Sequence, residues 1–168
     1  GNEADVTTTD MIEHLADDPD THVIAIYMEG LTDGPRFIRV AQEVTRHKPM
    51  VVFKGGRSDA GTKAVSSHTG ALAGSYSAYQ AAFEQSGVIA VDSVAELFQV
   101  AVALAYQPHP KGNRTVVITN AGGPAVIASD SLAAHGLRLA NLASETEASL
   151  REVLVPGAQS ANPVDMLG

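Results

Sequence analysis

VIAIYM at residues 23–28 decides the fold: six apolar residues stand between the turn-forming sequences DDPDTH and EG. A short apolar run with polar turns on both sides predicts a strand that is buried on both faces of a sheet. MVVF at residues 50–53 repeats this pattern. Between the two, residues 36–46 place apolar side chains at helical spacing. The strand–helix–strand order therefore predicts a parallel α/β sheet.

The same alternation continues through the first two thirds of the chain. The expected elements are a helix from Met11 to Ala16 capped by Thr9 or Asp10, a helix over 76–85 stopped by Gly87, a strand over 88–91, and a helix over 94–106 whose cap Ser93 forms a capping box with Glu96. QPHPKGN at residues 107–113 reads as a linker. We therefore expect one domain over residues 1–110 and the beginning of a second over 111–168.

Beyond the linker, the strand–glycine turn–helix order returns. We expect a strand over 115–119, a helix from the glycines to His135 ended by Gly136, a strand over 137–140, a helix over 143–154 capped by Ser144, and an extended end over 160–165. Glycine before a proline at the first helical position leaves an open helix N-terminus, which favours anions. Many strand–helix turns carry glycine for tight geometry alone, so Gly122 and Gly123 are a weak signal by themselves.

Composition narrows the functional classes. Apolar residues make up 45% of the 168, aromatic residues only 5%, and tryptophan is absent, which suits helices on a parallel sheet. The net charge of −8 argues against nucleic-acid or anionic-membrane partners. Without cysteine there is neither a disulfide nor a thiolate metal site, and the histidines lack metal-ligand spacing, so no metal site is expected among the residues of this chain. The chain has no signal peptide or membrane-length apolar run, so we expect a cytoplasmic protein.

One histidine stands out by its neighbours. His68 lies in SSHTGALAGS, residues 66–75, shortly after the basic, glycine-rich KGGRSDAGTK of residues 54–63. Small neighbours let backbone N–H groups and a ligand approach the ring, and an exposed imidazole is largely neutral near pH 7. A neutral imidazole beside a phosphate site can accept a phosphoryl group. The alternative is a solvated histidine in a glycine- and serine-rich loop that leaves the second strand.

Glu29 is the candidate partner of this histidine. It follows the first predicted strand, and ligands of open parallel sheets bind where strands end at their carboxyl termini. A carboxylate there can hold one ring nitrogen of His68 and leave the other free to attack. A solvated loop glutamate is the alternative. Residues 56–63 read GRSDAGTK, which lacks the lysine directly after the second glycine of a P-loop, so an independent ATPase is excluded.

These segments closely resemble the nucleoside-diphosphate-forming acyl-CoA synthetases, the relatives of succinyl-CoA synthetase and ADP-forming acetyl-CoA synthetase. The resemblance takes in GNEADV, VIAIYMEGLTDGPRFI, KGGRSDAGTKA, SSHTGALAGS, VITNAGGPAVIASD and ANPVDMLG, in the family's order over nearly the whole chain. It implies flavodoxin-like, three-layer βα units and the start of a second similar domain. It also implies phosphorylation of His68, orientation of that ring by Glu29, and phosphate binding at Gly30, Gly70, Gly122 and Gly123.

The family's reaction implies further molecules. Acyl-CoA and phosphate give an acyl phosphate and free CoA, the histidine takes the phosphoryl group, and ADP or GDP receives it, all reversibly. The implied cofactors are coenzyme A and ADP or ATP with Mg²⁺, with phosphate at the His68 site. The implied partners are a CoA-binding domain and an ATP-grasp domain or subunit, in an oligomeric full protein. Both are missing here, as is the first βαβ portion of the histidine domain, so this chain alone is not expected to complete the reaction.

Two other functions stay open on the sequence. Family-like domains fused to protein acetyltransferases sense acyl-CoA without catalysis, and a structural domain for subunit assembly would also fit. Retention of both His68 and Glu29 favours the phosphoryl-relay part of a synthetase.

Overall fold

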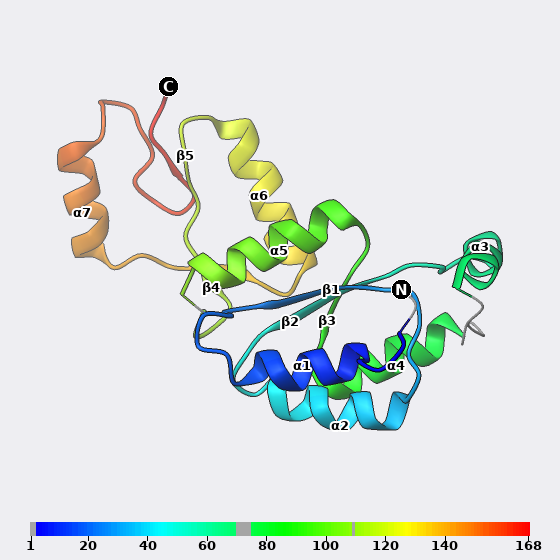
Figure 1. The fold of residues 1–168 in the computed structure, drawn as a ribbon. Helices are drawn as coiled ribbons and strands as arrows, with labels where there is room; N and C mark the ends of the chain where they lie inside the picture. Colours follow the sequence, from blue (N-terminus) through cyan, green and yellow to red (C-terminus); the bar gives the residue numbers. More distant parts are fainter. Residues whose placement is uncertain (1–2, 70–74, 109) are drawn as a thin grey trace. The chain divides into compact units, whose positions relative to one another are not determined.

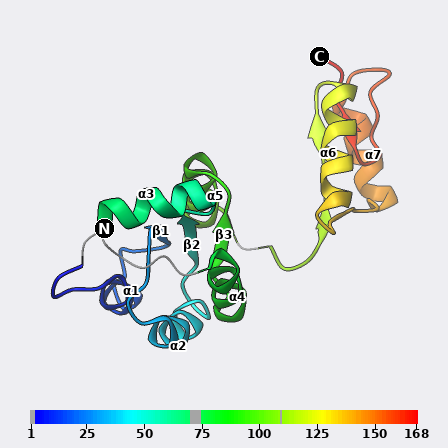
Figure 2. The same cartoon turned by 90° about the vertical axis from the view of Figure 1, so that its right-hand side faces the viewer.

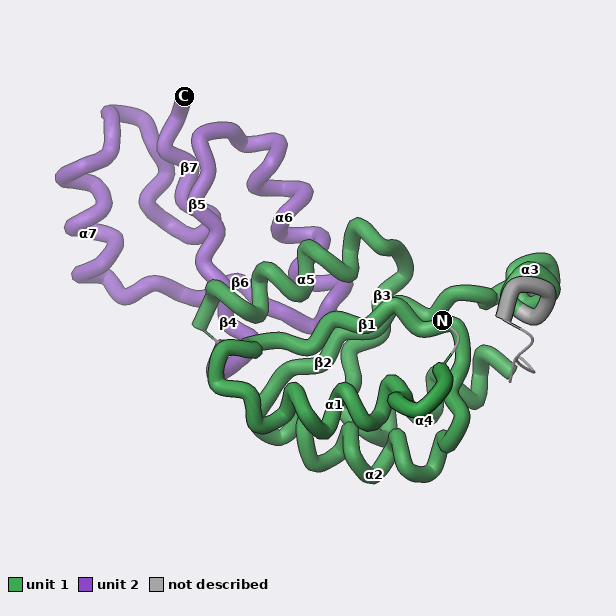
Figure 3. Tube along the Cα trace, in the orientation of Figure 1, with its two compact units in different colours: residues 1–109 green, residues 110–168 purple. Residues whose placement is uncertain are grey.

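The computed structural model describes residues 3–69, 75–108 and 110–168, and the chain forms two compact units, residues 1–109 and 110–168 (Figure 3). Unit 1 contains the helices α1 (Thr8–Ala16), α2 (Gly34–Val44), α3 (Asp59–Thr69), α4 (Tyr76–Ser86) and α5 (Val94–Tyr106), with strands β1 (Ile24–Met28), β2 (Met50–Lys54) and β3 (Ile89–Val91) (Figure 1). Each unit is described by itself.

The sheet of unit 1 is parallel, in the order β1-β2-β3. Ile24 lies opposite Met50 and Val51 lies opposite Ile89, so the three strands end at one edge. Helices α1, α2 and α4 cover one face, and α5 packs on the other (Figures 1 and 2). The expected parallel α/β fold with three layers is confirmed.

Each face of the sheet has its own core. On one side Phe37 of α2 and Phe83 of α4 are fully buried with the inward side chains of β1 and β2. On the other, Val51 and Val91 pack against Leu97 of α5. The predicted inward faces of residues 36–46 and 94–106 are thus confirmed. The expectation that strand 23–28 is buried on both faces is wrong: β1 alternates, and Tyr27 is 54% exposed, because β1 is paired only with β2 and α5 leaves this side chain open.

Local chemistry explains where the helices of unit 1 begin and end. The N-cap of α1 is Thr7, not Thr9 or Asp10: the Thr7 hydroxyl accepts from the Asp10 amide, and the Asp10 carboxylate binds back to the Thr7 amide. Ser93 caps α5 as predicted. The carboxylate of Glu96, however, binds the amide of Asp92 rather than that of Ser93, so the reciprocal capping box does not form.

Gly87 ends α4 as predicted, in the left-handed conformation at φ 69°. Its amide and that of Val88 turn back to the last carbonyls of the helix, at 3.3 Å from Glu84 and 3.0 Å from Phe83. This is the hydrogen-bond pattern that a C-terminal glycine permits at low steric cost. The turn delivers the chain directly into β3.

Unit 2 contains β4 (Arg114–Thr115), β5 (Ile118–Thr119), α6 (Gly122–Ala134), β6 (Arg138–Leu139), α7 (Ser144–Val153) and β7 (Val164–Asp165). β4 pairs in parallel with β6, and β5 pairs in parallel with β7. The single strand expected over 115–119 is therefore wrong. The strand is interrupted because the side-chain oxygen of Asn162 accepts a hydrogen bond from the amide of Val117 at 3.0 Å, between the two short ladders.

The helices of unit 2 follow the expected order. Gly136 stops α6 as predicted, at φ 71°. Ser144 is not the cap of α7, because the helix begins at this residue and Ala143 holds the N-cap position without a side-chain hydrogen bond. Within the described part of the chain, no helix is long and apolar enough to cross a membrane.

Candidate functional site

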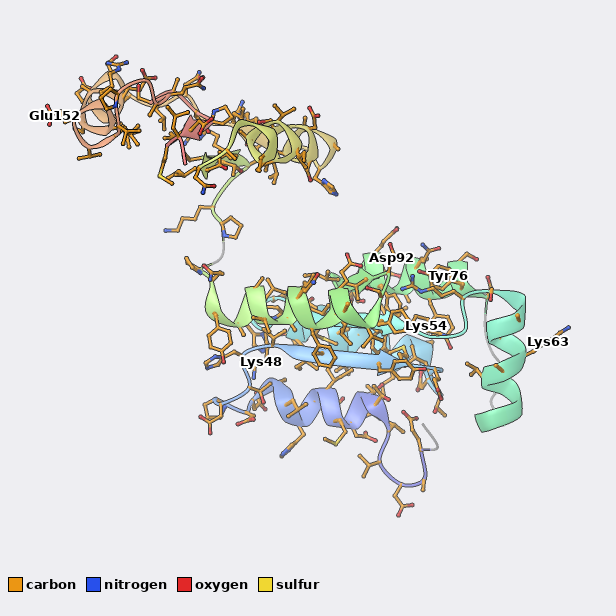
Figure 4. All side chains as sticks on the ribbon, turned by 90° about the horizontal axis from the view of Figure 1, so that it is seen from above. Lys48, Lys54, Lys63, Tyr76, Asp92 and Glu152 are labelled. Atoms are coloured by element: carbon orange, nitrogen blue, oxygen red, sulfur yellow. The ribbon has the colours of Figure 1, made fainter. Side chains whose placement is uncertain are left out.

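The carboxyl edge of the unit 1 sheet gathers most of the charged side chains of interest. The register pairs Met28 with Lys54 and Phe53 with Val91, so Glu29, the turn after β2 and Asp92 follow one another along this edge. Lys54 and Asp92 lie at this end of the unit, whereas Lys48, which precedes β2, lies at the other (Figure 4). This is the edge at which open parallel sheets bind their ligands.

The turn after β2 depends on two glycines. The amide of Gly55 continues the ladder to the carbonyl of Met28 at 2.8 Å, and a Cβ on Gly55 would lie 3.0 Å from the hydroxyl of Tyr27. Gly56 is left-handed at φ 72°, and a Cβ there would lie 2.9 Å from a methyl of Val65 in α3. Glycine is needed at Gly56, because its left-handed backbone and the nearby Val65 methyl both disfavour a side chain. At Gly55 a side chain would require the hydroxyl end of Tyr27 to shift. The turn thereby directs the chain into α3.

Lys54 is the buried cation of this edge. Only 2% of the residue is exposed; its ammonium donates to the carbonyl of Gly55 and lies 4.5 Å from the centre of the Tyr79 ring. Burial lowers the pKa of Lys54, the negative charge of Glu29 opposes this, and the positive charge of Arg57 adds to it. A buried lysine whose pKa responds to two neighbouring charges is typical of a functional edge.

Glu29 follows β1 and is half-buried. Its carboxylate accepts from the hydroxyl of Tyr27 at 3.3 Å. Burial raises the pKa of Tyr27, and the charge and hydrogen bond of Glu29 raise it further. The turn that follows Glu29 is tied to α4, because the amide of Leu31 donates to the Tyr79 hydroxyl at 3.2 Å. Tyr79 thus contacts both the Glu29 turn and Lys54.

Gly30 is separated from the first turn of α2. The helix begins at Gly34, and its cap Asp33 accepts from the amide of Arg36 at 2.9 Å. A carboxylate already occupies this N-terminus, which makes it less favourable for a second anion than the sequence alone predicts. Gly30 nevertheless lies directly beside Glu29 at the sheet edge.

The backbone at His68 differs from the expected loop. Residues 59–69 form α3, in which His68 is the penultimate residue. The helix forms because the Ser58 hydroxyl accepts from the Gly61 amide at 3.1 Å and no helix-breaking residue follows before Thr69. The histidine therefore lies near a helix C-terminus, not in an irregular loop or at a helix start. Its side chain, and Gly70 altogether, lie outside the part of the chain that the structure describes.

Gly122 and Gly123 form the first turn of α6 in unit 2. The cap residue Ala121 provides no side-chain hydrogen bond, and Gly123 has open space where a Cβ would stand. At Gly122 a Cβ would lie 3.6 Å from a carboxylate oxygen of Asp165. The helix N-terminus has no side-chain cap, as predicted, but the helix begins at Gly122, so Pro124 is its third residue and not its first. This helix N-terminus lies in unit 2, whereas His68 lies in unit 1.

The sequence predicts that the cations of residues 54–63 reinforce an anion site near His68, but it does not predict the burial of Lys54 or the contacts of Arg57. Nor does it single out Tyr76, Tyr79 or Asp92. Charged residues directly after an apolar strand are a detectable signal for Lys54 and Asp92. Tyr76 and Tyr79 carry no such signal, since their contacts are set by where α4 packs. Among residues 3–69, 75–108 and 110–168, no group of three acidic or histidine side chains is placed to hold a metal ion.

Comparisons with known proteins find similar sequences along nearly the whole chain. The model of the succinyl-CoA ligase like flavodoxin domain matches residues 1–104, and that of the Ligase-CoA domain matches residues 115–168. The chain is 48% identical to the acetate–CoA ligase (ADP-forming) II subunit alpha of Pyrococcus furiosus, over 99% of this chain and 36% of that protein. It is 51% identical to acetate–CoA ligase (ADP-forming) I of Archaeoglobus fulgidus, over 100% of this chain and 24% of that protein.

A solved structure is similar throughout. Dinucleotide forming acetyl-coenzyme A synthetase 1 of Ca. Korarchaeum cryptofilum, in complex with phosphate and ADP, superposes with a TM-score of 0.90 at 40% identity, covering 100% of this chain and 37% of that chain. The chain thus spans 24% to 37% of the length of these relatives. With both family models matched in order and the fold shared, the chain belongs to the nucleoside-diphosphate-forming acyl-CoA synthetase family.

Proposed function

We propose that this chain is the phosphoryl-relay part of a nucleoside-diphosphate-forming acyl-CoA synthetase and that its relay group is His68. The reaction joins acyl-CoA, phosphate and ADP or GDP to give a carboxylic acid, CoA and ATP or GTP, reversibly. The observation that carries the proposal lies at the carboxyl edge of unit 1. There Glu29 neighbours the glycine turn after β2, and this turn leads directly into the helix whose last turn contains His68.

The step assigned to His68 is a balanced transfer. One neutral ring nitrogen attacks the phosphorus of an acyl phosphate; the N–P bond forms and the bond from phosphorus to the carboxylate oxygen breaks. The leaving carboxylate takes the electron pair of that bond. In the second step an oxygen of the nucleoside diphosphate attacks the same phosphorus, and the N–P bond breaks. Little covalent chemistry is asked of other residues, so positioning and charge stabilisation supply the catalysis.

Glu29 has the role of orienting the ring. When one nitrogen bonds to phosphorus, the other carries a proton and the ring becomes cationic. A carboxylate that accepts this N–H selects the reactive tautomer and stabilises the cation. Lys54 lies close enough to Glu29 for the two charges to interact.

The phosphate itself needs backbone donors. We assign this role to Gly30, Gly70, Gly122 and Gly123, where the absence of a Cβ allows close approach. The uncapped N-terminus of α6 supports the assignment for Gly122 and Gly123, since its amides and dipole favour an anion. The capped N-terminus of α2 gives no such support for Gly30, whose assignment rests on its place directly after Glu29.

The proposal extends to the rest of the protein. Coenzyme A and the nucleotide with Mg²⁺ would be bound mainly by a CoA-binding domain and an ATP-grasp domain or subunit, in an oligomeric enzyme of the cytoplasm. The metal would neutralise charge on the nucleotide phosphates. The two relatives from P. furiosus and A. fulgidus are longer than this chain, which agrees with further domains or subunits.

The test is phosphorylation of the complete protein, with any partner subunit, by γ-labelled ATP and Mg²⁺. Acid-labile, alkali-stable label is expected in the wild type and should disappear in His68→Ala. His14→Ala is the matched control, because His14 is an exposed histidine of α1 away from the sheet edge. Glu29→Gln should slow labelling without abolishing it, whereas Glu43→Gln, at an exposed ion pair with Arg46, should not.

The outcomes separate the functions. Label confined to proteins with an intact His68 supports the relay. A wild type that takes no label yet binds acyl-CoA would refute it and favour an acyl-CoA-sensing module, as in acetyltransferase fusions. Label that persists in His68→Ala would place the relay group elsewhere.

A further inference from the structure

Arg57 makes an unusually complete set of contacts at the carboxyl edge. Its Nε donates to the carbonyl of Lys54 at 2.9 Å, at the end of β2. One terminal nitrogen donates to the carbonyl of Val91 at the end of β3, and the other donates to the carboxylate of Asp92 at 2.5 Å. The guanidinium therefore ties together two neighbouring strand ends.

The same guanidinium contacts two aromatic rings. Its central carbon lies 5.0 Å from the ring centre of Phe53 and 5.2 Å from that of Tyr76. Both distances are within the range of cation–π contacts. The Arg57 side chain is 24% exposed, whereas Asp92 is 89% exposed, so the strand carbonyls and the rings, not the ion pair, hold it in place.

The position of these contacts along the chain matters more than their number. Arg57 stands two residues before α3, and Tyr76 is the first residue of α4. His68 lies between them in the sequence. One side chain thus contacts the residue that opens α4 while its own backbone leads into α3, so both flanks of the His68 segment are joined to the ends of β2 and β3.

We propose that Arg57 is a positioning residue for phosphoryl transfer, holding the two flanks of the His68 segment against the sheet edge beside Glu29. This inference rests on the proposed function. Arg57 acts through the segment and is not assigned a contact with the reacting atoms. Reactive groups that are misplaced by about 1 Å can lose on the order of a hundredfold in rate, so a side chain that sets both flanks has a direct effect on turnover.

Arginine is required here for geometric reasons. A guanidinium is planar and offers five N–H donors, which allows it to reach three acceptors and contact two rings at once. A lysine retains the charge, but its single nitrogen cannot reproduce these directions. Arg57→Lys is therefore a sharp test, because it keeps the charge and removes the geometry. Tyr76→Leu removes one ring contact, whereas Tyr76→Phe keeps the ring.

The experiment compares these variants in the complete synthetase, with any partner subunit. The readouts are kcat, the KM for ADP, the amount of phosphohistidine, and the thermal midpoint. Arg57→Lys should lower kcat at least about tenfold while the KM for ADP changes less than about twofold, since positioning and not nucleotide binding is lost. Tyr76→Leu should lower kcat more than Tyr76→Phe. Arg46→Lys is the matched control, because Arg46 is exposed and bonds only to Glu43 in the described chain.

Each outcome is decisive. A folded Arg57→Lys protein with the kcat of Arg46→Lys overturns the inference. The inference is also overturned if Arg57→Lys lowers the thermal midpoint but keeps a normal kcat at temperatures below that midpoint, because the residue would then serve stability alone. If wild type carries no phosphohistidine, the proposed function fails and the inference with it. If the wild type carries phosphohistidine but Arg57→Lys has the same kcat as Arg46→Lys, the inference fails while the proposed function stands.

Discussion

Asn162→Ala should destabilise unit 2 more than any single change to its exposed helices. The side-chain amide donates to the carbonyls of Thr115 and Ala140, both at 2.9 Å, and its oxygen accepts from the amide of Val117 at 3.0 Å. The residue is half-buried and lies just before β7. It therefore links the β4–β6 pair to the β5–β7 pair, and alanine leaves three backbone groups without these partners.

The expected cost follows from these three bonds. A net contribution of about 1 kcal/mol for each gives about 2–4 kcal/mol, including the backbone groups left unpaired. A unit of about 60 residues has a stability of roughly 3–9 kcal/mol by the usual value per residue. The substitution would thus remove a large share of the stability of unit 2 and leave unit 1 unchanged.

Native-state hydrogen exchange followed by mass spectrometry is the appropriate assay, because all the aromatic side chains lie in unit 1 and fluorescence would not report on unit 2. Amides in residues 114–119 and 162–166 should exchange about 30- to 700-fold faster, since 1.4 kcal/mol corresponds to a factor of ten. Amides of residues 24–28 serve as the internal reference.

Asn113→Ala provides the matched control. Its amide makes one exposed hydrogen bond, at 3.3 Å, to the carbonyl of Gly136, so its loss should cost less than about 0.5 kcal/mol. If Asn162→Ala exchanges no faster than Asn113→Ala in residues 114–119 and 162–166, the three hydrogen bonds do not hold the unit together and the reasoning is refuted.

Two further predictions concern unit 1. Phe83→Ala should lower the free energy of unfolding, measured by urea unfolding followed by circular dichroism, by about 3–5 kcal/mol, because Phe83 is 1% exposed. The same change at Phe98, which is 62% exposed, should lower it by less than about 1 kcal/mol, and equal losses would contradict the assigned core. Hydrogen bonds from the backbone and side chain of Thr7, then from Arg36, lower the pKa of Asp10 to about 2. The stabilisation that Asp10 provides is therefore complete above the unfolded pKa of 3.8 and is lost as the pH falls toward 2. Asp10→Asn should flatten this part of the curve of unfolding free energy against pH. An unchanged curve would show that Asp10 does not cause the pH dependence.

Most helices and strands were predictable from local patterns. Residues 94–106 have apolar side chains at helical spacing after a serine cap, and the helix occupies the predicted range. Gly87 and Gly136 end helices because a left-handed residue can turn the chain back to the last carbonyls. The single strand expected over 115–119 was wrong because a side chain from a distant segment intervenes, as Asn162 does between β4 and β5. The errors at the caps of α1 and α7 are shifts of the helix start by a few residues.

The candidate site was only partly predictable. Glu29 could be placed at the carboxyl edge because it follows an apolar strand, and the KGGR turn because it follows the next one. The helical backbone at His68 was missed, since small residues and a nearby glycine outweighed the continuous helix-compatible stretch. The roles of Gly30, Gly70, Gly122 and Gly123 in phosphate binding stay predictions.

Local sequence therefore suffices for the order of elements, the parallel sheet and the edge at which chemistry is expected, because hydrophobic period and turn residues act over a few positions. Tertiary structure alone decides which charges meet there. Lys54 is buried under Tyr79, and Arg57 reaches both Val91 and Tyr76, through contacts between residues far apart in the chain. Such contacts depend on how the helices pack and on strand register, and no pattern within a single segment encodes either of them.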